Sequence, residues 1–393
     1  MTRNKVILKK GKERFVKQNR HPWIFSGAIE RFSPGMENGD IAFICSFEGE
    51  FLAQGYFHLE NSLSGRILSF DQRSISEVVR EKVQKALALR SFFLASSQTN
   101  CFRLINAEED GLPGLIVDFY DGVLVLQINT FGMEKLRSLI VEVLVKEVKP
   151  KSLYEKSCSK ARLQEGLFEE EGFLYGPEIT EIVVKENGIS FAVSITEGQK
   201  TGFFLDQREM RKKIGELSKG RSLLNCFSYS GGFSLYALQG GARFVTSVDS
   251  CAKATALCTK NQVLSGFPLE SHQIKQEDVF DFLDREDLTK YDVIILDPPA
   301  FAKKRQDVEP AMQGYRQINQ KVFEKCKPGT LLLTCSCSYF IDQGLFKQVL
   351  FQAASAAQKE VKIVSKHMQS PDHPISLYHP EGEYLKSFFL WIE

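Results

Sequence analysis

The sequence has no long apolar run, no paired cysteine motif and no dinucleotide-binding fingerprint. No apolar run reaches about 18 residues, so a membrane-spanning helix is not expected. None of the nine cysteines is spaced as Cys-x-x-Cys, which disfavours a zinc site or a disulfide framework and fits reduced thiols. The N-terminus has no apolar segment typical of a secretory signal. We therefore expect a cytoplasmic protein with no bound metal and no membrane contact.

The chain carries almost no net charge, but its basic residues are unevenly placed. The formal charge of the 393 residues is +1, and a chain of this length is expected to form two or three domains. Residues 1–20 contain eight Lys or Arg and a single acid, Glu13. Such a run fits a nucleic-acid contact surface, and it also fits a solvated terminus. Charge alone leaves both interpretations open.

Residues 1–185 show two successive patterns. Short strand-like runs broken by Gly, Asn and Asp fill residues 1–72 and predict a small β-barrel. Residues 73–98 have apolar residues three and four apart, which predicts a helix with Ser74 or Ser76 as its N-cap. The rest of 73–185 alternates strands with a helix and predicts a small α+β domain, in which the acidic run 169–171 is interpreted as a solvated turn.

Residues 186–393 alternate apolar runs with helical segments. The runs GRSLLNCF, ARFVTSVDS, YDVIILDPPA and LLLTCSC read as strands, and the segments between them read as helices. Strands separated by helices of this length indicate a parallel sheet covered by helices. The sequence therefore predicts an α/β protein whose C-terminal part is Rossmann-like.

A glycine-rich turn follows the first of these strands. It contains Ser228, Tyr229, Gly231 and Gly232 and leads into a predicted helix. Glycines at such a junction let a ligand approach the backbone, and the helix N-terminus offers free N–H groups. Asp249 ends the next strand, where a carboxylate can accept both hydroxyls of a ribose. The pattern predicts a cofactor that carries a nucleoside, although packing glycines and a helix-capping acid would give the same sequence.

The third strand ends in Asp297, Pro298 and Pro299. Proline cannot continue a buried strand, so the chain must leave the sheet here with restricted geometry. Phe301 is a candidate to stack on a base, or a core residue. Lys303 and Lys304 then offer phosphate partners, or belong to an ordinary charged loop.

A thiol stands at the end of the fourth strand. In a parallel sheet, Cys337 would lie at the same edge as Asp297. Carbon 5 of a pyrimidine is a weak nucleophile, and addition of a thiolate at carbon 6 makes it reactive. An acid that hydrogen-bonds the ring nitrogen would stabilise the developing charge. The pair predicts methyl transfer to a pyrimidine carbon, although pattern alone does not choose between Cys337 and the nearby Cys335.

Five segments together resemble one known family. The segments LLNCFSYSGGF, KTGFFLDQR, LDPPAF, TCSCS and DHPISLYHPEGEYLK are similar to those of the bacterial 23S ribosomal RNA large-subunit methyltransferase I family. The resemblance covers nearly the whole chain. It implies a PUA-like RNA-binding barrel at 1–72, a central domain at 73–185 and a class I methyltransferase domain at 186–393. It also implies cytosine-5 methylation of 23S rRNA with S-adenosylmethionine as cofactor; a homodimer is left open.

The resemblance also assigns roles to particular residues. It implies Cys337 as nucleophile and Asp297 as its catalytic partner. The expected cofactor-binding residues are Ser228, Tyr229, Gly231, Gly232, Asp249, Asp278, Val279 and Gln207. The expected substrate-binding residues are Pro298, Pro299, Phe301, Lys303, Lys304 and Arg208, with Arg20 and His21 touching RNA from the N-terminal barrel.

Three other functions are compatible with parts of the sequence. An N6-adenine methyltransferase also uses an Asp-Pro-Pro motif, but it needs no thiol. A non-catalytic RNA-binding factor in ribosome assembly would keep the cofactor fold as a vestige. A small-molecule oxidoreductase ranks last, because the dinucleotide fingerprint is absent.

Overall fold

The computed structural model describes residues 4–94 and 97–393, which form two compact units. The first unit comprises residues 1–184, 193–205 and 371–382, and the second comprises 185–192, 206–370 and 383–393. Arg3 of the basic run and residues 95–96 of the predicted helix lie outside the described residues. Each unit is considered below by itself.

The first unit begins with a six-stranded sheet that has the strand order β2-β6-β5-β4-β1-β3. Its strands are β1 (Asn4–Leu8), β2 (Trp23–Phe25), β3 (Ile29–Phe32), β4 (Ile41–Cys45), β5 (Phe51–Phe57) and β6 (Leu63–Ser69), and helix α1 spans Glu13–Lys17. Strands β1 and β4 run parallel, and the other pairs are antiparallel. Every strand-like run predicted in residues 1–72 is confirmed as a strand.

Helix α2 (Ile75–Phe93) follows this sheet and starts where the sequence predicted. The Ser74 hydroxyl accepts a hydrogen bond from the Glu77 amide, and the Glu77 carboxylate accepts one from the Ser74 amide. This reciprocal capping satisfies two donors that a helix start otherwise leaves unpaired. Ser74 rather than Ser76 is therefore the N-cap.

A second sheet in the first unit has the order β11-β10-β9-β8-β7. Its elements are β7 (Cys101–Asn106), β8 (Leu115–Tyr120), β9 (Val123–Ile128), α3 (Phe131–Lys135), α4 (Arg137–Val148), β10 (Ser152–Ser157), α5 (Lys160–Gln164) and β11 (Glu170–Tyr175). The prediction of a solvated turn at residues 169–171 was wrong, because Glu170 and Glu171 belong to β11. This strand pairs with β10 alone and lies at the edge of the sheet, where charged side chains remain in water.

The second unit is built on a seven-stranded sheet with the order β16-β15-β14-β17-β18-β20-β19. Its strands are β14 (Ser222–Cys226), β15 (Phe244–Asp249), β16 (His272–Gln276), β17 (Val293–Leu296), β18 (Leu331–Ser336), β19 (Val361–His367) and β20 (Lys386–Ile392). The first five strands are parallel, as predicted, while β20 is antiparallel to both β18 and β19. The strand order reverses between β14 and β17, which is where sheets of this type bind ligands.

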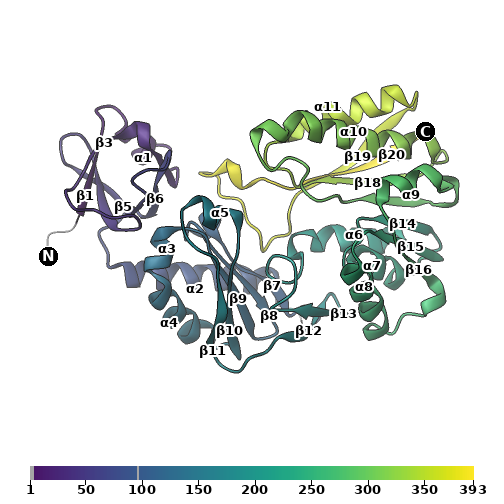
Figure 1. The fold of residues 1–393 in the computed structure, drawn as a ribbon, viewed down its shortest axis with the longest axis horizontal. Coiled ribbons are helices and arrows are strands. Elements are labelled where there is room, and N and C mark those ends of the chain that lie inside the picture. The colour runs from purple at the N-terminus through teal and green to yellow at the C-terminus, as the bar shows by residue number, and fades with distance from the viewer. Residues whose placement is uncertain (1–3, 95–96) are drawn as a thin grey trace. The chain divides into compact units, whose positions relative to one another are not determined.

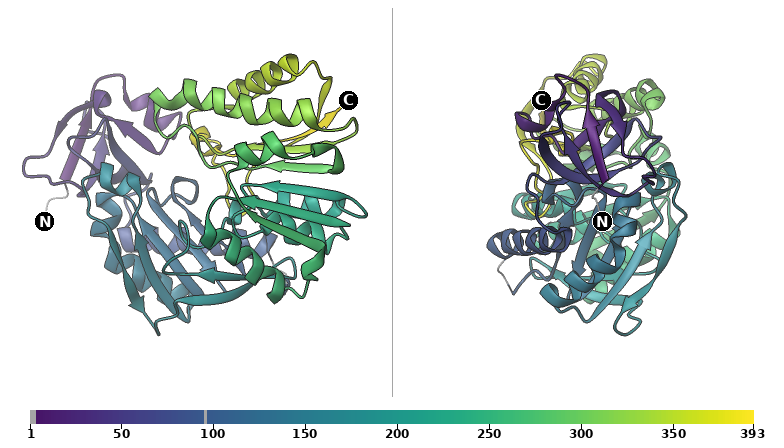
Figure 2. Two further views of the ribbon diagram at one scale, coloured as in Figure 1. Left: turned by 45° about the vertical axis from the view of Figure 1, so that its right-hand side comes forward. Right: turned by 90° about the vertical axis from the view of Figure 1, so that its left-hand side faces the viewer.

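Helices cover both faces of this sheet (Figures 1 and 2). They are α6 (Arg208–Leu217), α7 (Gly232–Gln239), α8 (Ala252–Leu264), α9 (Val279–Arg285), α10 (Val308–Lys325) and α11 (Gln343–Ala356). Leu223 of β14 packs with residues of α6 and α7, and the next residue, Leu224, packs with residues of α9, α10 and α11. Successive strand residues point to opposite faces, so this alternation produces the three-layer arrangement predicted from the β/α pattern.

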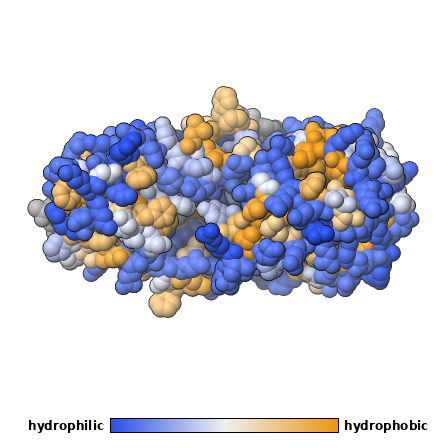
Figure 3. Space-filling view, turned by 90° about the horizontal axis from the view of Figure 1, so that it is seen from above, coloured by the Kyte–Doolittle hydropathy of each residue, from blue (hydrophilic) through white to orange (hydrophobic). Residues whose placement is uncertain are grey.

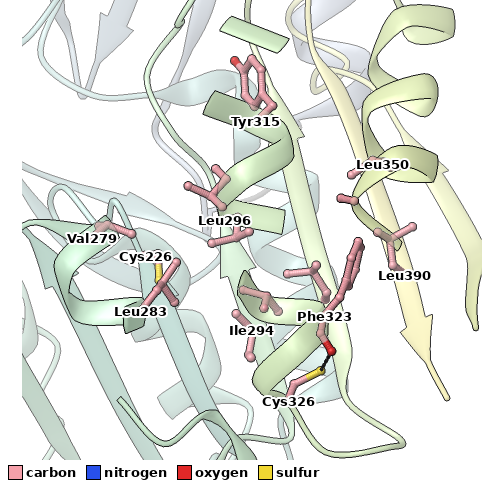
Figure 4. Close-up of a cluster of buried hydrophobic side chains, with 14 of the residues drawn as sticks. Cys226, Val279, Leu283, Ile294, Leu296, Tyr315, Phe323, Cys326, Leu350 and Leu390 are labelled. Carbon is pink, nitrogen blue, oxygen red and sulfur yellow. Dashed lines mark hydrogen bonds between the residues drawn. The ribbon is translucent and has the colours of Figure 1, made fainter. Parts of the chain in front are cut away.

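Figure 4 shows the apolar core between the sheet and helices α9 to α11. Ile294 and Leu296 of β17 contact this core and are fully buried, as are Phe323 of α10 and Leu283 of α9. A core of this size fixes the direction in which β17 and β18 leave the sheet, because close-packed interiors tolerate little shift. The loops after both strands are thereby held in position.

A short two-stranded sheet completes the fold. Strands β12 (Glu181–Glu186) and β13 (Ile189–Ser194) form a two-stranded sheet. Among the described residues no helix is both long enough and apolar enough to cross a membrane. Most of the face drawn in Figure 3 is hydrophilic, and apolar residues occur there in separate small groups. The domain boundaries at 72/73 and 185/186 stay predictions.

Candidate functional site

Three loops leave the carboxyl ends of neighbouring strands in the second unit. We call residues 227–232, after β14, the glycine-rich turn, residues 297–304, after β17, the proline loop, and residues 337–338, after β18, the thiol loop. Strand β14 pairs with β17, and β17 pairs with β18. The three loops therefore follow one another along a single edge of the sheet, across the point where the strand order reverses.

The glycine-rich turn has an unusual backbone. Phe227, Tyr229 and Gly231 all have positive φ, at 59°, 45° and 80°. Left-handed conformations at non-glycine residues are unfavourable and cluster at functional sites. Alternation of left-handed with ordinary residues also turns successive N–H groups toward a common side, which suits a polar ligand. Gly231 is required for a second reason, since a Cβ there would lie 2.3 Å from the Cys258 sulfur.

Asp249 at the end of β15 fixes this turn. Its carboxylate accepts hydrogen bonds from the Tyr229 amide at 2.8 Å and from the Cys251 amide at 2.9 Å. A carboxylate can accept about four hydrogen bonds, so two backbone donors leave room for further ones. The side chain of Asp249 can thus hold the turn and bind the hydroxyls of a ligand together.

Asp278 and Val279 lie at the start of α9, after β16. The Asp278 carboxylate caps this helix by accepting hydrogen bonds from the Phe280 and Asp281 amides. The side chain of Val279 is 2% exposed and packs in the core. Any contact of Val279 with a ligand must therefore come from its backbone.

Asp297 is oriented by Gln207. The Gln207 side-chain amide donates a hydrogen bond to Asp297 Oδ1 at 3.1 Å, and Gln207 is only 4% exposed. The structure brings the Gln207 amide to the acid of the proline loop, and its predicted contact with the cofactor stays a prediction. Asp297 itself is partly exposed, as is required of an acid that contacts a substrate.

Arg208 lies in a buried cluster of charged side chains. Its guanidinium is 1% exposed, and its Nε lies 3.4 Å from Oε2 of the fully buried Glu186. Arg211 also pairs with Glu186, at 2.7 Å through both Nε and Nη2. A buried carboxylate needs such partners to offset its lost hydration. In this structure Arg208 therefore takes part in a buried ion-pair cluster, and its predicted contact with the substrate stays a prediction.

The two neighbouring cysteines of β18 and the thiol loop differ sharply. Cys335 is fully buried, and burial raises the pKa of its thiol well above the ordinary value, with the nearby Asp297 charge acting in the same direction. Cys337 is partly exposed, and its sulfur lies 3.9 Å from the Pro298 carbonyl oxygen. Thiolates are the reactive form, so the environment selects Cys337 over Cys335 as the available thiol.

A buried hydroxyl ties the proline loop to the thiol loop. Ser338 Oγ accepts a hydrogen bond from the Ala302 amide at 3.1 Å and lies 3.0 Å from the Tyr315 hydroxyl. These contacts keep Cys337 beside Pro298. Phe301 packs against Tyr315, with ring centroids 4.6 Å apart, and borders the apolar core, so these contacts account for its partial burial.

The remaining predicted residues of the proline loop are exposed. Pro299, Lys303 and Lys304 lie at the surface. The backbone amides of both lysines donate to Asp307, which shapes the loop and leaves the two ammonium groups in solvent. Solvated ammonium groups beside a site suit contacts with phosphates.

Arg20 and His21 belong to the first unit. The Arg20 guanidinium lies 4.4 Å from the centre of the Phe70 ring, beside a cavity of about 500 Å³. His21 Nε2 lies 3.1 Å from a Glu381 carboxylate oxygen. Both side chains are therefore held by protein contacts within their unit, and their predicted contact with RNA stays a prediction.

Comparisons with known proteins identify the family. A model of S-adenosylmethionine-dependent methyltransferases matches residues 168–377, and a model of PUA-like domains matches residues 6–70. The chain is 38% identical to ribosomal RNA large subunit methyltransferase I of Aliivibrio fischeri over 98% of both chains. It is also 38% identical to the protein of the same name from Aeromonas salmonicida over 97% of both. The chain belongs to the ribosomal RNA large subunit methyltransferase I family.

Solved structures agree with this membership at the level of the fold. The SMU.776 protein, crystallised with SAH, has a TM-score of 0.85 and 24% identity over 98% of this chain and 99% of its own. A second structure, from Streptococcus mutans, has a TM-score of 0.83 with the same identity and coverage. The predicted PUA-like domain, Rossmann-like methyltransferase domain and S-adenosylmethionine cofactor are thus confirmed.

The residues of the glycine-rich turn fit S-adenosylmethionine. Ser228 Oγ is buried and has no hydrogen-bond partner among the described residues. A buried hydroxyl without a partner is unfavourable, and the polar amino-acid part of the cofactor would satisfy it. The spare acceptor capacity of Asp249 suits the ribose hydroxyls.

Sequence reasoning missed one side chain at this edge. Lys386 begins β20, is 3% exposed, and donates hydrogen bonds to the Ser338 and Tyr384 carbonyl oxygens. The segment that contains it, EYLK, contributed to the family resemblance but suggested no role. The available signal was a lysine at the start of a strand that is mostly apolar.

Proposed function

We propose that this protein methylates carbon 5 of a cytosine in 23S ribosomal RNA through a transient bond between Cys337 and carbon 6. The observation that carries the proposal is the position of the Cys337 thiol. It is partly exposed, lies beside the Pro298 carbonyl, and stands one strand away from Asp297 at the edge where the sheet binds ligands. A methyltransferase for an exocyclic amine would need no thiol there.

The first step makes carbon 5 nucleophilic. The Cys337 thiolate donates an electron pair to carbon 6 and a carbon–sulfur bond forms; the carbon 5–carbon 6 double bond is broken, and its electrons form an enamine between carbons 4 and 5 that makes carbon 5 nucleophilic. Negative charge develops toward the ring nitrogen at position 3 and its neighbouring oxygen. Asp297 in its acid form donates a hydrogen bond to this edge and passes its proton to the ring nitrogen, which neutralises that charge and leaves Asp297 as a carboxylate. Gln207 fixes the direction of the Asp297 carboxyl.

Bound S-adenosylmethionine would supply an electrophilic methyl group to carbon 5, and the electron pair of its methyl–sulfur bond would stay on the sulfur, so that S-adenosylhomocysteine leaves. The Asp297 carboxylate, or a water molecule that it orients, then accepts the proton from carbon 5, and the proton on the ring nitrogen leaves to solvent. The electrons of that carbon–hydrogen bond restore the ring double bond, the carbon–sulfur bond breaks, and Cys337 leaves as a thiolate. Atoms and electrons balance without an oxidant or a reductant, and the thiol is regenerated in each cycle.

Recognition of RNA fits the rest of the chain. The relatives are named for ribosomal RNA of the large subunit, and a PUA-like domain occupies residues 6–70. Lys303 and Lys304 present solvated ammonium groups at the end of the proline loop, which suits the phosphates on either side of a target nucleotide. The basic run near the N-terminus adds charge of the same sign. An rRNA substrate also implies action in the cytoplasm.

Product analysis tests the proposal. The purified protein is incubated with unmodified 23S rRNA and S-adenosylmethionine that carries a labelled methyl group, and the RNA is digested to nucleosides. We expect the label in 5-methylcytidine. Label in N6-methyladenosine, or none at a millimolar cofactor concentration that binds, would overturn it. Bisulfite mapping of rRNA from cells with and without the protein then identifies the cytosine.

A further inference from the structure

Lys386 carries a buried ammonium group at the start of β20. Its side chain is 3% exposed, and among the described residues it forms no ion pair. Its printed hydrogen bonds go to two backbone carbonyls, Ser338 O at 2.7 Å and Tyr384 O at 2.8 Å. A buried lysine is normally paired, because the loss of hydration is unfavourable. Its position therefore calls for an anion nearby.

The register of the sheet places this ammonium beside the thiol loop. Lys386 pairs with Ser336 of β18, and Cys337 follows Ser336 directly. The hydrogen bond to Ser338 O joins the lysine to the residue on the other side of Cys337. The thiol is thus flanked on both sides by residues that Lys386 contacts.

The charges that face Lys386 come from three segments. They are Cys337 of the thiol loop, Asp342 at the start of α11, and Glu383 before β20. Both carboxylates are exposed, where water screens them. Asp342 also caps α11 through the Leu345 amide. Among these groups Cys337 is the one that is partly buried, and so the one that interacts with Lys386 in a medium of lower polarity.

We infer that Lys386 is a positioning residue whose ammonium group serves as the counter-charge of the Cys337 thiolate. The inference deepens the proposed function and rests on it only for the identity of the electrophile. The thiol proton leaves to solvent, the thiolate forms beside the ammonium, and the same ammonium receives the thiolate again when the product is released. The ammonium itself transfers no proton in this scheme.

The electrostatics agree with this arrangement. Burial lowers the pKa of Lys386 to about 8, and the negative form of Cys337 opposes that shift, as do Asp342 and Glu383. Coupling of this kind is reciprocal, because the free energy by which the thiolate stabilises the ammonium equally stabilises the thiolate. At neutral pH the lysine is still mostly charged and able to act.

The pH dependence of Cys337 alkylation tests the inference without RNA or cofactor. Full-length protein is treated with iodoacetamide at a series of pH values, and the Cys337 peptide is quantified by mass spectrometry, so that the exposed Cys158 and Cys251 do not interfere. We expect the wild-type midpoint below the ordinary thiol value of about 8.5. Lys386→Met should raise it by about one unit, which lowers the thiolate fraction at neutral pH about tenfold.

Two further variants make the outcome decisive. Lys386→Arg keeps the charge and should keep the midpoint within about half a unit. Lys362→Met is the matched control, because Lys362 is an exposed lysine of the adjacent strand β19, paired with Glu393, and should change nothing. A wild-type midpoint at or above about 9 overturns the inference even if Lys386→Met does not fold. So does a folded Lys386→Met with an unchanged midpoint.

The same samples distinguish this inference from the proposed function. Formation of 5-methylcytidine reports on the reaction, whereas alkylation reports only on the coupling of Lys386 with Cys337. A normal midpoint shift in a protein that makes no 5-methylcytidine would sink the proposed function alone. Formation of 5-methylcytidine with no midpoint shift would sink the role of Lys386 alone.

Discussion

The candidate site has two parts that are supported by different kinds of contact. The cofactor half is the glycine-rich turn with Asp249, and the substrate half is the proline loop with the thiol loop. Beneath the glycine-rich turn runs a chain of buried polar groups, in which His272 Nε2 lies 2.7 Å from Ser247 Oγ and His272 Nδ1 lies 3.0 Å from Gln262 Oε1. Ser247 in turn contacts Ser234, which accepts a hydrogen bond from Asn225. Beneath the proline loop and the thiol loop lie the apolar side chains of β17 and β18.

The two halves thus differ in what holds them in place: hydrogen bonds between buried polar groups on one side and apolar packing on the other. On the cofactor half the protein must hold an unfavourable backbone in place, because Phe227, Tyr229 and Gly231 all have positive φ. Hydrogen bonds between β14, β15 and β16 do so with directional contacts. On the substrate half the proposed reaction depends on two side chains, Cys337 and Asp297, and a close-packed apolar base fixes the strands that precede them. Substitutions that alter the backbone should therefore have their largest effect on the cofactor half. Substitutions that remove a side-chain group should have their largest effect on the substrate half.

Loss of the thiol should have the largest effect. Cys337→Ala removes the group that bonds to carbon 6, so the rate of methyl transfer should fall by a factor on the order of 10⁴ or more. Cys335→Ala is the matched control, because that thiol is buried and its pKa is raised, and it should retain activity within about tenfold. Single-turnover rates measure both. Equal losses in the two variants would remove the distinction between the neighbouring cysteines.

The Asp297→Asn variant should show the second largest loss of activity. The amide keeps an oxygen for Gln207 but changes the charge and the proton of the group that meets the ring, so kcat should fall about 10² to 10³-fold. Affinity for S-adenosylmethionine should change by less than about threefold, since Asp297 lies on the substrate half. A decrease in cofactor affinity with an unchanged kcat would contradict the assignment of Asp297 to the substrate half.

Gly231→Ala tests the backbone of the cofactor half. The new Cβ would lie 2.3 Å from the Cys258 sulfur at a residue with a φ of +80°, and the variant should lose about 2 to 3 kcal/mol of stability. Gly220→Ala is the control, because Gly220 has a φ of +70° with nothing within 4 Å, and should lose only about 1 kcal/mol. Thermal melts of both variants measure the loss of stability, and calorimetric titration with S-adenosylmethionine measures their affinity for the cofactor. Equal losses would mean that the turn tolerates a side chain.

The polar network predicts a pH effect specific to the cofactor half. Burial lowers the pKa of His272 to about 4, so as pH falls below about 6.5 the unfolded chain binds a proton that the folded chain does not. Stability should therefore fall between pH 6.5 and 4, by about 2 kcal/mol from pH 7 to pH 5. In His272→Gln this part of the loss should disappear. Urea unfolding at the two pH values measures it, and parallel curves for both proteins would contradict the prediction.

The sequence predicted the parts of this site that follow from strand and turn patterns. The parallel order of β14 to β18 brings Asp249, Asp297 and Cys337 to one edge, and this placement needs only the β/α alternation and the prolines. The choice between Cys337 and Cys335 could not be made from the pattern, because both are cysteines of one strand end. Burial, which depends on the packed fold, distinguishes them.

Other features depend on long-range packing and so escaped prediction. Lys386 reaches the thiol loop because β20 inserts antiparallel between β18 and β19, a placement that parallel β/α patterning does not foresee. Arg208 looked like a polar helix start, and only the fold supplies its buried partner Glu186. The strand at Glu170 was mistaken for a turn, since an edge strand can carry the charged residues of a loop.

Covalent trapping tests the central claim most directly. RNA that carries 5-fluorocytosine at the target position is incubated with the protein and S-adenosylmethionine. Fluorine cannot leave carbon 5 as a proton does, so the sulfur–carbon bond cannot be broken again. We expect a stable protein–RNA complex whose cross-linked peptide contains Cys337, and none with Cys337→Ala. A methylating protein that yields no such complex, or one joined through a different residue, would contradict the account.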